Sequence, residues 1–103
     1  MVCGVEIKPS ALKWGVSESE IAAVVAYPML RVTLAARMAG ALPVLHIGPA
    51  SENEPYLEVI VHLAPTVPVA FHAMVLRRRL ATSLGLDQLI DINYGPQKGA
   101  HNA

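Results

Sequence analysis

The segment from Tyr56 to Leu63, YLEVIVHL, constrains the fold more than any other stretch of the chain. Its alternate positions from Leu57 onward are all apolar, whereas the positions between them are mixed and include Glu58 and His62. Alternation with a period of two is typical of a β-strand that buries one face. We therefore expect a sheet with one side packed against helices, and with Glu58 and His62 on its other, mixed side.

Three further segments have the composition of strands. They are short, contain β-branched residues and are bounded by Gly or Pro, and their sequences are MLRVTL at 29–34, LPVLHI at 42–47 and VPVAFHA at 67–73. Together with YLEVIVHL they predict four strands.

The last predicted strand carries a histidine. The apolar residues Val69 and Phe71 share one parity, so we expect them on the apolar side of the sheet, and the next residue, His72, on the mixed side. His72 is then a neighbour of Glu58 and His62.

The segments on either side of the predicted strands have helical periodicity. Residues 8–28 predict two short helices joined at Gly15, the second beginning with a capping box at Ser17. From Leu76 onward, leucines recur every four residues as far as Gly85, which predicts a final helix that ends there.

Length and charge limit the organisation of the chain. Its 103 residues, 53% of them hydrophobic, predict one domain over residues 1–86, followed by a loosely structured tail, 87–103, that lacks apolar periodicity. The formal net charge is zero, so no overall field attracts the chain to nucleic acid or to an anionic membrane, and any anion site must be local. A low charged fraction favours a homo- or hetero-oligomer, because monomers rarely expose large apolar patches.

The compartment is also an expectation from composition. Cys3 is the single cysteine, which excludes an internal disulfide and fits a reducing environment. The first ten residues lack a signal-peptide pattern, and the most apolar run, 21–30, is about half the length of a membrane span and is followed by Arg31. We expect a cytoplasmic protein without a membrane helix.

The segment FHAMVLRRRL, residues 71–80, places one histidine beside three consecutive arginines. On the predicted helix, Arg78 lies opposite the leucine stripe and faces solvent or a partner, whereas Arg77 borders the stripe and lies closest to His72. Taken alone, the arginines fit a solvated helix face or a patch for an acidic partner, and His72 fits a hydrogen-bonded sheet residue.

The order of three segments resembles a known family. SALKWGVSESEI, VLHIGPASENEPYLEVIVHL and FHAMVLRRRL, within residues 5–84, are similar to the BrnT-like group of the RelE superfamily, the toxins of bacterial toxin–antitoxin systems. The resemblance implies an α+β, RelE-like fold: two N-terminal helices, a curved four-stranded antiparallel sheet and a C-terminal helix. It also implies an endoribonuclease that acts on mRNA, alone or on the ribosome, until an antitoxin protein covers it.

The resemblance also implies a set of site residues. It gives catalytic positions to His72, Arg77 and Arg79, and these residue types suit metal-independent RNA cleavage, because histidine can move a proton near neutral pH and arginine binds phosphate. The expected substrate-contacting residues are Arg78, Glu58, His62 and Trp14. No cofactor is expected; a metal held by His46, His62 and His72 is the alternative that we consider.

The chain departs from the family pattern at three positions. Trp14 replaces a histidine, Val75 a proline and Leu80 an aromatic residue. Two hypotheses therefore stay open: a toxin-type endoribonuclease, or a non-catalytic protein-interaction module on the same fold. The second would act as a homodimer or as an inhibitor or binding factor, encoded for example by a phage or mobile element.

Overall fold

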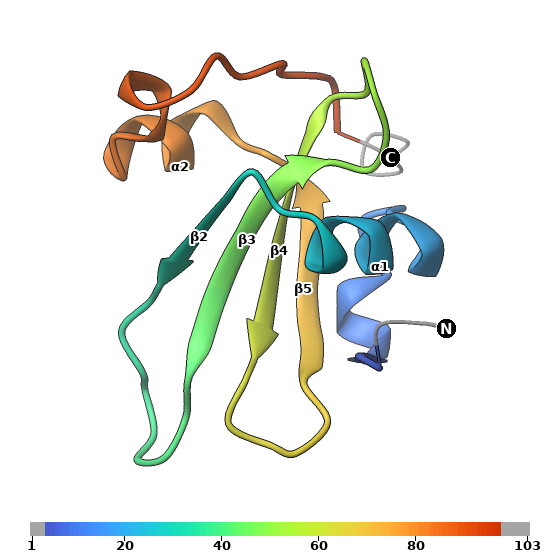
Figure 1. The fold of residues 1–103 in the computed structure, drawn as a ribbon, viewed down its shortest axis with the longest axis vertical. Coiled ribbons are helices and arrows are strands. Elements are labelled where there is room, and N and C mark those ends of the chain that lie inside the picture. Colours follow the sequence, from blue (N-terminus) through green and yellow to red (C-terminus); the bar gives the residue numbers. More distant parts are fainter. Residues whose placement is uncertain (1–3, 98–103) are drawn as a thin grey trace.

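The computed structural model describes residues 4–97, and its centre is a five-stranded mixed sheet (Figure 1). The order of the strands is β1-β5-β4-β3-β2, and every neighbouring pair is antiparallel except β1 and β5, which are parallel. The strands are β1 (Glu6–Ile7), β2 (Leu30–Thr33), β3 (Pro43–Pro49), β4 (Tyr56–His62) and β5 (Val69–Val75). Cys3 and the end of the expected tail, 98–103, lie outside the described residues.

Four helical elements accompany the sheet. They are the 3₁₀ turn η1 (Pro9–Ala11), the helix α1 (Glu18–Ala26), the short helix α2 (Arg78–Ser83) and the 3₁₀ turn η2 (Leu86–Gln88). The predicted capping box is confirmed, because the Ser17 hydroxyl accepts from the Glu20 N–H at 3.2 Å and the Ser17 N–H donates to the Glu20 carboxylate at 2.9 Å. These bonds satisfy two backbone donors that would otherwise be free at the start of α1.

The expected RelE-like arrangement of two N-terminal helices and a four-stranded antiparallel sheet is wrong. The first predicted helix is only the 3₁₀ turn η1. The run between Pro9 and Gly15 is too short for its hydrogen bonds to offset the free-energy cost of helix nucleation, and Gly15 turns the chain with φ +85°. The extra strand, β1, is two residues long and pairs in parallel with β5, which makes the sheet mixed. Two residues are too few to show a period, so this strand could not be predicted from the sequence.

The face of the sheet under η1 and α1, named the α1 face below, carries the larger core. Its residues come from η1, α1, the loop between them, alternate positions of β4, and three positions of β5. The fully or almost fully buried members are Ala11, Val16, Ile21, Val24, Leu57, Val59, Val61, Ala70, Ala73 and Val75.

The opposite face, named the α2 face, is covered at one end only. There α2, η2 and the segment after them pack on β3, with Leu45, Ile47, Leu76, Ala81 and Leu86 buried between them. The described part of the expected tail also contacts this end of the sheet: the Tyr56 N–H donates to the Asn93 carbonyl at 2.8 Å, and the Gln97 amide donates to the Val75 carbonyl at 2.7 Å.

A β-bulge in β5 decides which side chains face which way. Ile60 pairs with His72, but the next residue, Val61, pairs with Ala70, so Phe71 is an extra residue without a partner in β4. The carbonyl of Phe71 accepts a hydrogen bond from the Ser10 hydroxyl at 2.7 Å. Residue 71 and residue 72 therefore both belong to the α2 face.

The bulge corrects the expected burial of the last strand. Val69 and Phe71 do not face the helix-packed core, and Phe71 is 38% exposed; the small residues Ala70 and Ala73 are buried there instead. The predicted position of His72 on the same face as Glu58 is confirmed. His72 pairs with Ile60 of β4, and Ile60, like Glu58, lies on the α2 face, between the α1-face residues of β4.

This assignment of faces is testable by truncation. Val59→Ala should lower the free energy of unfolding by about 2 kcal/mol, because Val59 is fully buried on the α1 face. Phe71→Ala, although it removes a larger side chain, should lower it by about 1 kcal/mol or less, because Phe71 is partly exposed. Urea denaturation measures both; a larger loss for Phe71→Ala would return Phe71 to the core.

Candidate functional site

Glu58 is a fully buried carboxylate in the middle of the sheet. It lies on the α2 face of β4, between Ile47 on β3 and Met74 on β5, and its side chain is 0% exposed. An isolated ionised carboxylate in such a place is strongly disfavoured, so its partners determine whether it is tolerated.

Arg77 and His72 supply these partners. Oε1 of Glu58 accepts from the backbone N–H of Arg77 at 3.0 Å and from its Nε at 3.1 Å. Oε2 accepts from Nη2 of Arg77 at 2.8 Å and from Nε2 of His72 at 2.8 Å. The carboxylate thus has four donors, which fill the lone pairs that a carboxylate offers.

The end of β5 explains how Arg77 reaches the carboxylate. Leu76 is buried against β3 and α2, and its N–H donates to the Tyr56 carbonyl at 2.9 Å, which fixes the chain directly beyond the strand. Arg77 then keeps an extended backbone (φ −82°, ψ 133°) as the residue before α2, so its N–H and its side chain turn towards Glu58 together. The three residues of this Glu58–His72–Arg77 cluster come from β4, β5 and the β5–α2 junction.

The cluster keeps Glu58 ionised. Burial by itself raises the pKa of Glu58, but the hydrogen bonds from the His72 and Arg77 side chains, the backbone N–H of Arg77 and the charge of Arg77 together outweigh it, so the pKa is lowered. The hydrogen bond to Glu58 raises the pKa of Arg77. Partial burial acts in the opposite direction, but its effect on the pKa is smaller. Both partners are therefore charged at neutral pH.

The arrangement fixes the proton of His72. An ionised carboxylate only accepts hydrogen bonds, so Nε2 of His72 must carry the proton that it donates to Glu58. Nδ1 is left as the ring atom that can take up or release a proton. The His72 side chain is 23% exposed, which leaves it accessible from the α2 face.

Arg77 also keeps capacity for a ligand. Nε and one N–H of Nη2 are used by Glu58, so three of its five N–H donors do not contact the carboxylate. The side chain is 50% exposed. A half-exposed guanidinium with free donors beside an accessible histidine is suited to a phosphate or another oxyanion.

The other predicted site residues lie outside this cluster. Arg78 stacks on Tyr94, with 4.0 Å between its Cζ and the ring centroid, and the side chain of Arg79 forms no hydrogen bond or ion pair with any residue that the structure describes. Trp14 lies between η1 and α1 under the Nζ of Lys13, at 5.3 Å. None of the three has a described contact with His72 or Arg77.

His62 has a different role from His72. It lies on the α2 face at the end of β4, and its Nδ1 accepts a hydrogen bond from the Leu42 N–H at 3.2 Å. It therefore holds the chain between β2 and β3 against β4, and no hydrogen bond joins it to Glu58.

The alternative metal site is not assembled. His46 pairs with Val59 and so faces the α1 side, whereas His62 and His72 face the other side of the sheet. Burial, and secondarily Arg31, lower the pKa of His46 despite a 3.0 Å hydrogen bond to the Val44 carbonyl. Residues 4–97 contain no group of three or more His, Cys, Asp or Glu side chains that could hold a metal ion.

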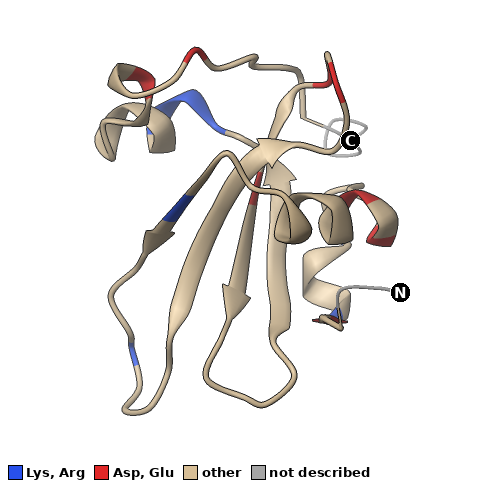
Figure 2. Cartoon of the chain, viewed as in Figure 1, with Lys and Arg blue, Asp and Glu red and all other residues tan. Residues whose placement is uncertain are grey.

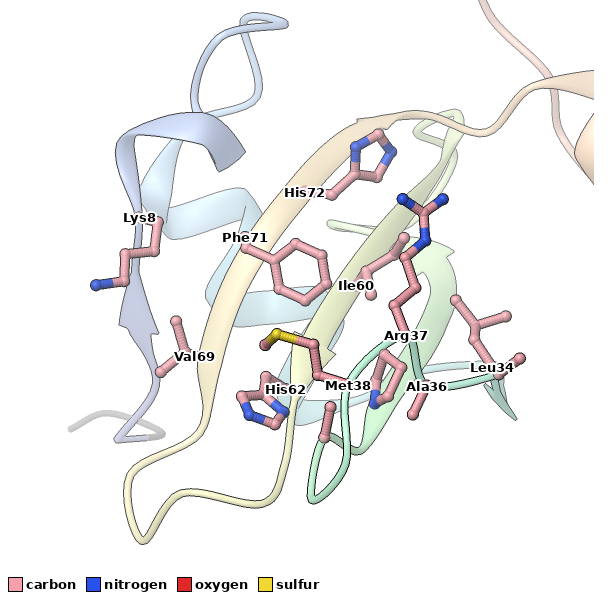
Figure 3. A pocket seen from close by; sticks show the side chains of 13 residues that line it. Lys8, Leu34, Ala36, Arg37, Met38, Ile60, His62, Val69, Phe71 and His72 are labelled. Atoms are coloured by element: carbon pink, nitrogen blue, oxygen red, sulfur yellow. The ribbon is translucent and has the colours of Figure 1, made fainter.

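A groove of about 920 Å³ opens beside the cluster on the α2 face. Its floor is formed by β4 and β5, and the segment between β2 and β3, residues 34–42, forms its wall (Figure 3). His72 lines the groove and also binds Glu58, so the groove and the cluster are continuous. Phe71 and Arg37, which also line it, were not among the predicted site residues; the bulge that exposes Phe71 has no sequence signature.

The distribution of charge favours an anion on this side. Figure 2 shows basic residues on the segment leading into α2, on β2 and on the segment after β2, and acidic residues on α1, in the β3–β4 loop and also around η2, next to α2. Around the groove itself the described lining residues include Lys8 and Arg37 and no acidic residue, so positive charge prevails there although the net charge of the chain is neutral.

Comparisons with known proteins give no further information: no family model, no curated protein and no solved structure matches the chain. Among the described helices, none has the length and apolar character needed to cross a bilayer.

Replacing Glu58 tests the electrostatic account. Glu58→Gln should lower the free energy of unfolding at pH 7 by about 2–3 kcal/mol, because charged hydrogen bonds are lost and the donors of Arg77 remain. Since the pKa of Glu58 is lowered in the folded state, its contribution is present above the ordinary value of 4.5 and is lost as the pH falls below it. The difference between wild type and variant should therefore shrink on acidification.

The matched control for that experiment is Glu54→Gln, which changes an exposed carboxylate in the β3–β4 loop. It should alter neither the stability nor its pH dependence by more than about 0.5 kcal/mol. Equal stability of Glu58→Gln and wild type across the pH range would contradict the account.

The tautomer of His72 is a second test. At a pH where the imidazole is neutral, ¹H–¹⁵N correlation spectra should place the proton on Nε2 and leave Nδ1 unprotonated, because only Nε2 faces the carboxylate. In Glu58→Gln the ring should lose this single tautomer or change its ¹⁵N shifts. A proton on Nδ1 in wild type would rule out the proposed orientation.

Proposed function

We propose that this protein is a metal-independent endoribonuclease of the toxin type, and that the Glu58–His72–Arg77 cluster is its catalytic site. One observation carries the proposal: one fully buried carboxylate binds both a histidine that lines an accessible groove and an arginine whose side chain is half exposed. The proposal does not depend on a RelE-like topology, since the chemistry belongs to the site and not to the fold.

The first step is binding of a phosphodiester. The free donors of Arg77 take the non-bridging oxygens of the phosphate, and its guanidinium opposes the negative charge that grows on them as the phosphorus becomes five-coordinate. Because Arg77 is already held by Glu58 in two places, little reorganisation accompanies binding.

The second step is cleavage by the neighbouring 2′-hydroxyl. Nδ1 of His72 takes the proton of the hydroxyl, O2′ forms a bond to phosphorus, and the bond from phosphorus to the 5′-oxygen of the following nucleotide breaks. That oxygen leaves with a proton from solvent, and His72 returns its own proton to solvent. The products are a 2′,3′-cyclic phosphate and a free 5′-hydroxyl.

Glu58 is a positioning residue in this scheme. It is saturated with hydrogen bonds and has no exposed surface, so it touches no substrate atom. Its fixed negative charge orients His72 and stabilises the imidazolium that forms when Nδ1 accepts a proton, as the third group does in nucleophile–base arrangements.

The proposed biological role is arrest of translation through cleavage of mRNA, free or on the ribosome, with an antitoxin protein as partner. The proposed compartment is the cytoplasm, where both substrates occur. The local positive charge beside the groove supports an anionic partner surface, either RNA or the acidic part of an antitoxin.

A non-catalytic interaction module is the second candidate. It is favoured by the large apolar side chains that are exposed around the groove and the neighbouring loops, namely Met38, Leu42, Val67 and Phe71. A partner protein with a complementary apolar surface would remove them from water. On this alternative, the cluster serves stability alone.

Controlled expression separates the two candidates. We expect wild type to arrest growth and to cleave bulk RNA, and the double variant His72→Ala, Arg77→Ala to do neither, because it lacks both the proton acceptor and the phosphate donors. Growth curves and electrophoresis of RNA from the same cultures measure this. The control is Arg79→Gln, which removes an exposed arginine of the same helix outside the cluster and should retain at least about a third of the activity.

Folding of the double variant must be measured alongside. Glu58 keeps the backbone N–H of Arg77 but loses the other donors, so purified protein should still show a cooperative thermal transition, at a lower Tm. Harmless expression of folded wild type would refute the nuclease and favour the interaction module.

A further inference from the structure

We propose that the groove binds one nucleobase of single-stranded RNA, stacked on Phe71, next to the phosphate held by Arg77. This inference rests on the proposed function and names its substrate class and the subsite that orients it. It goes beyond the cluster, because the residues that would contact the base, Phe71 and the apolar walls of the groove, do not contact Glu58.

The first support is the placement of Phe71. The bulge in β5 puts two consecutive residues, Phe71 and His72, on the α2 face, where regular alternation would have sent one of them to the other side. Figure 3 shows the Phe71 ring projecting into the same hollow as the imidazole. A ligand group that lies on Phe71 is therefore the immediate neighbour of a group that contacts His72.

The second support is the pairing of apolar walls with cations. Ile60, Met38 and Leu34 give the groove apolar sides, and Arg37 extends from the 34–42 segment towards the end where His72 lies (Figure 3). None of the described residues that line the groove is acidic; Lys8, which also lines it, is paired with the exposed Glu6 at 3.1 Å. A nucleotide combines a flat apolar face with a phosphate on either side, which is the chemistry that such walls and cations match.

The third support is that the wall of the groove is already in place. The segment 34–42 is fixed by the hydrogen bond from the Leu42 N–H to His62, by the 2.9 Å bond from the Leu63 N–H to the Leu42 carbonyl, and by the 2.9 Å bond from the Leu34 N–H to the Pro43 carbonyl. A preformed groove loses little conformational entropy when a base enters.

The geometry favours a single strand over a duplex. Paired bases are stacked on each other, and the deep, narrow major groove of an RNA helix does not admit side chains, so a base can lie on Phe71 only when it is splayed out. Arg37, which lines the groove, then contacts a phosphate next to that base.

The test is a binding measurement that does not require cleavage. A fluorescent, fully 2′-O-methylated single-stranded oligonucleotide lacks the attacking hydroxyl and reports binding through its anisotropy. Phe71→Ala should weaken binding by about tenfold, in line with the loss of one stacked base. Phe71→Trp should bind as well as wild type or better, which distinguishes stacking from disturbed folding.

Two further variants complete the series. Val67→Ala removes another exposed apolar side chain, outside the groove, and should leave the Kd unchanged within about twofold. Arg37→Gln should weaken binding and lower the slope of log K against log salt by about one, as expected for one lost phosphate contact.

The outcomes separate this inference from the proposed function. Binding that depends on Phe71, with no cleavage of unmodified RNA by wild type, would keep the base subsite and refute the nuclease. Cleavage by wild type with equal binding by Phe71→Ala would keep the nuclease and refute the subsite. Absence of oligonucleotide binding by wild type, or equal binding of a duplex, would also overturn the inference and point to a protein partner for the groove.

Discussion

The ionised carboxylate of Glu58, buried in the centre of the sheet, is the interaction on which the rest of the site depends. A buried charge in that position needs hydrogen-bond donors. The residues paired with Glu58 on β3 and β5, Ile47 and Met74, are apolar, so the donors must come from other residues. Arg77 meets the need with three N–H groups and His72 with one. The hydrogen bonds that stabilise the buried charge of Glu58 also fix the orientation of the His72 and Arg77 side chains.

The bulge in β5 has a comparable influence on the ligand side. It places small residues, Ala70 and Ala73, where η1 and α1 pack closely, and it moves Phe71 to the opposite face. The hydroxyl of Ser10, in η1, donates a hydrogen bond to the Phe71 carbonyl, so a residue from the α1 side of the sheet stabilises the bulge. The bulge that directs Phe71 into the groove is thus hydrogen-bonded to η1, on the opposite side of the sheet.

The cluster and the groove together describe an asymmetric site. One end is polar, charged and fixed by buried hydrogen bonds, and the groove that continues from it is lined mainly by apolar side chains. A ligand must then carry an anionic group next to a flat apolar one. This combination relates the proposed chemistry at His72 and Arg77 to the proposed recognition at Phe71, although each can fail without the other.

The sequence by itself determined the local features: the strand β4 with its two faces, the capping box at Ser17, and the neighbourhood of His72, Glu58 and Arg77 near the end of β5. These follow from periodicities and pairings that act over a few residues. Only the tertiary structure decided that β1 joins β5 in parallel, that Phe71 leaves the core, and that Glu58 is the centre of the site. Each depends on contacts between residues far apart in the chain, such as the hydrogen bond from Ser10 to the Phe71 carbonyl at the bulge, and no short-range pattern reveals these contacts.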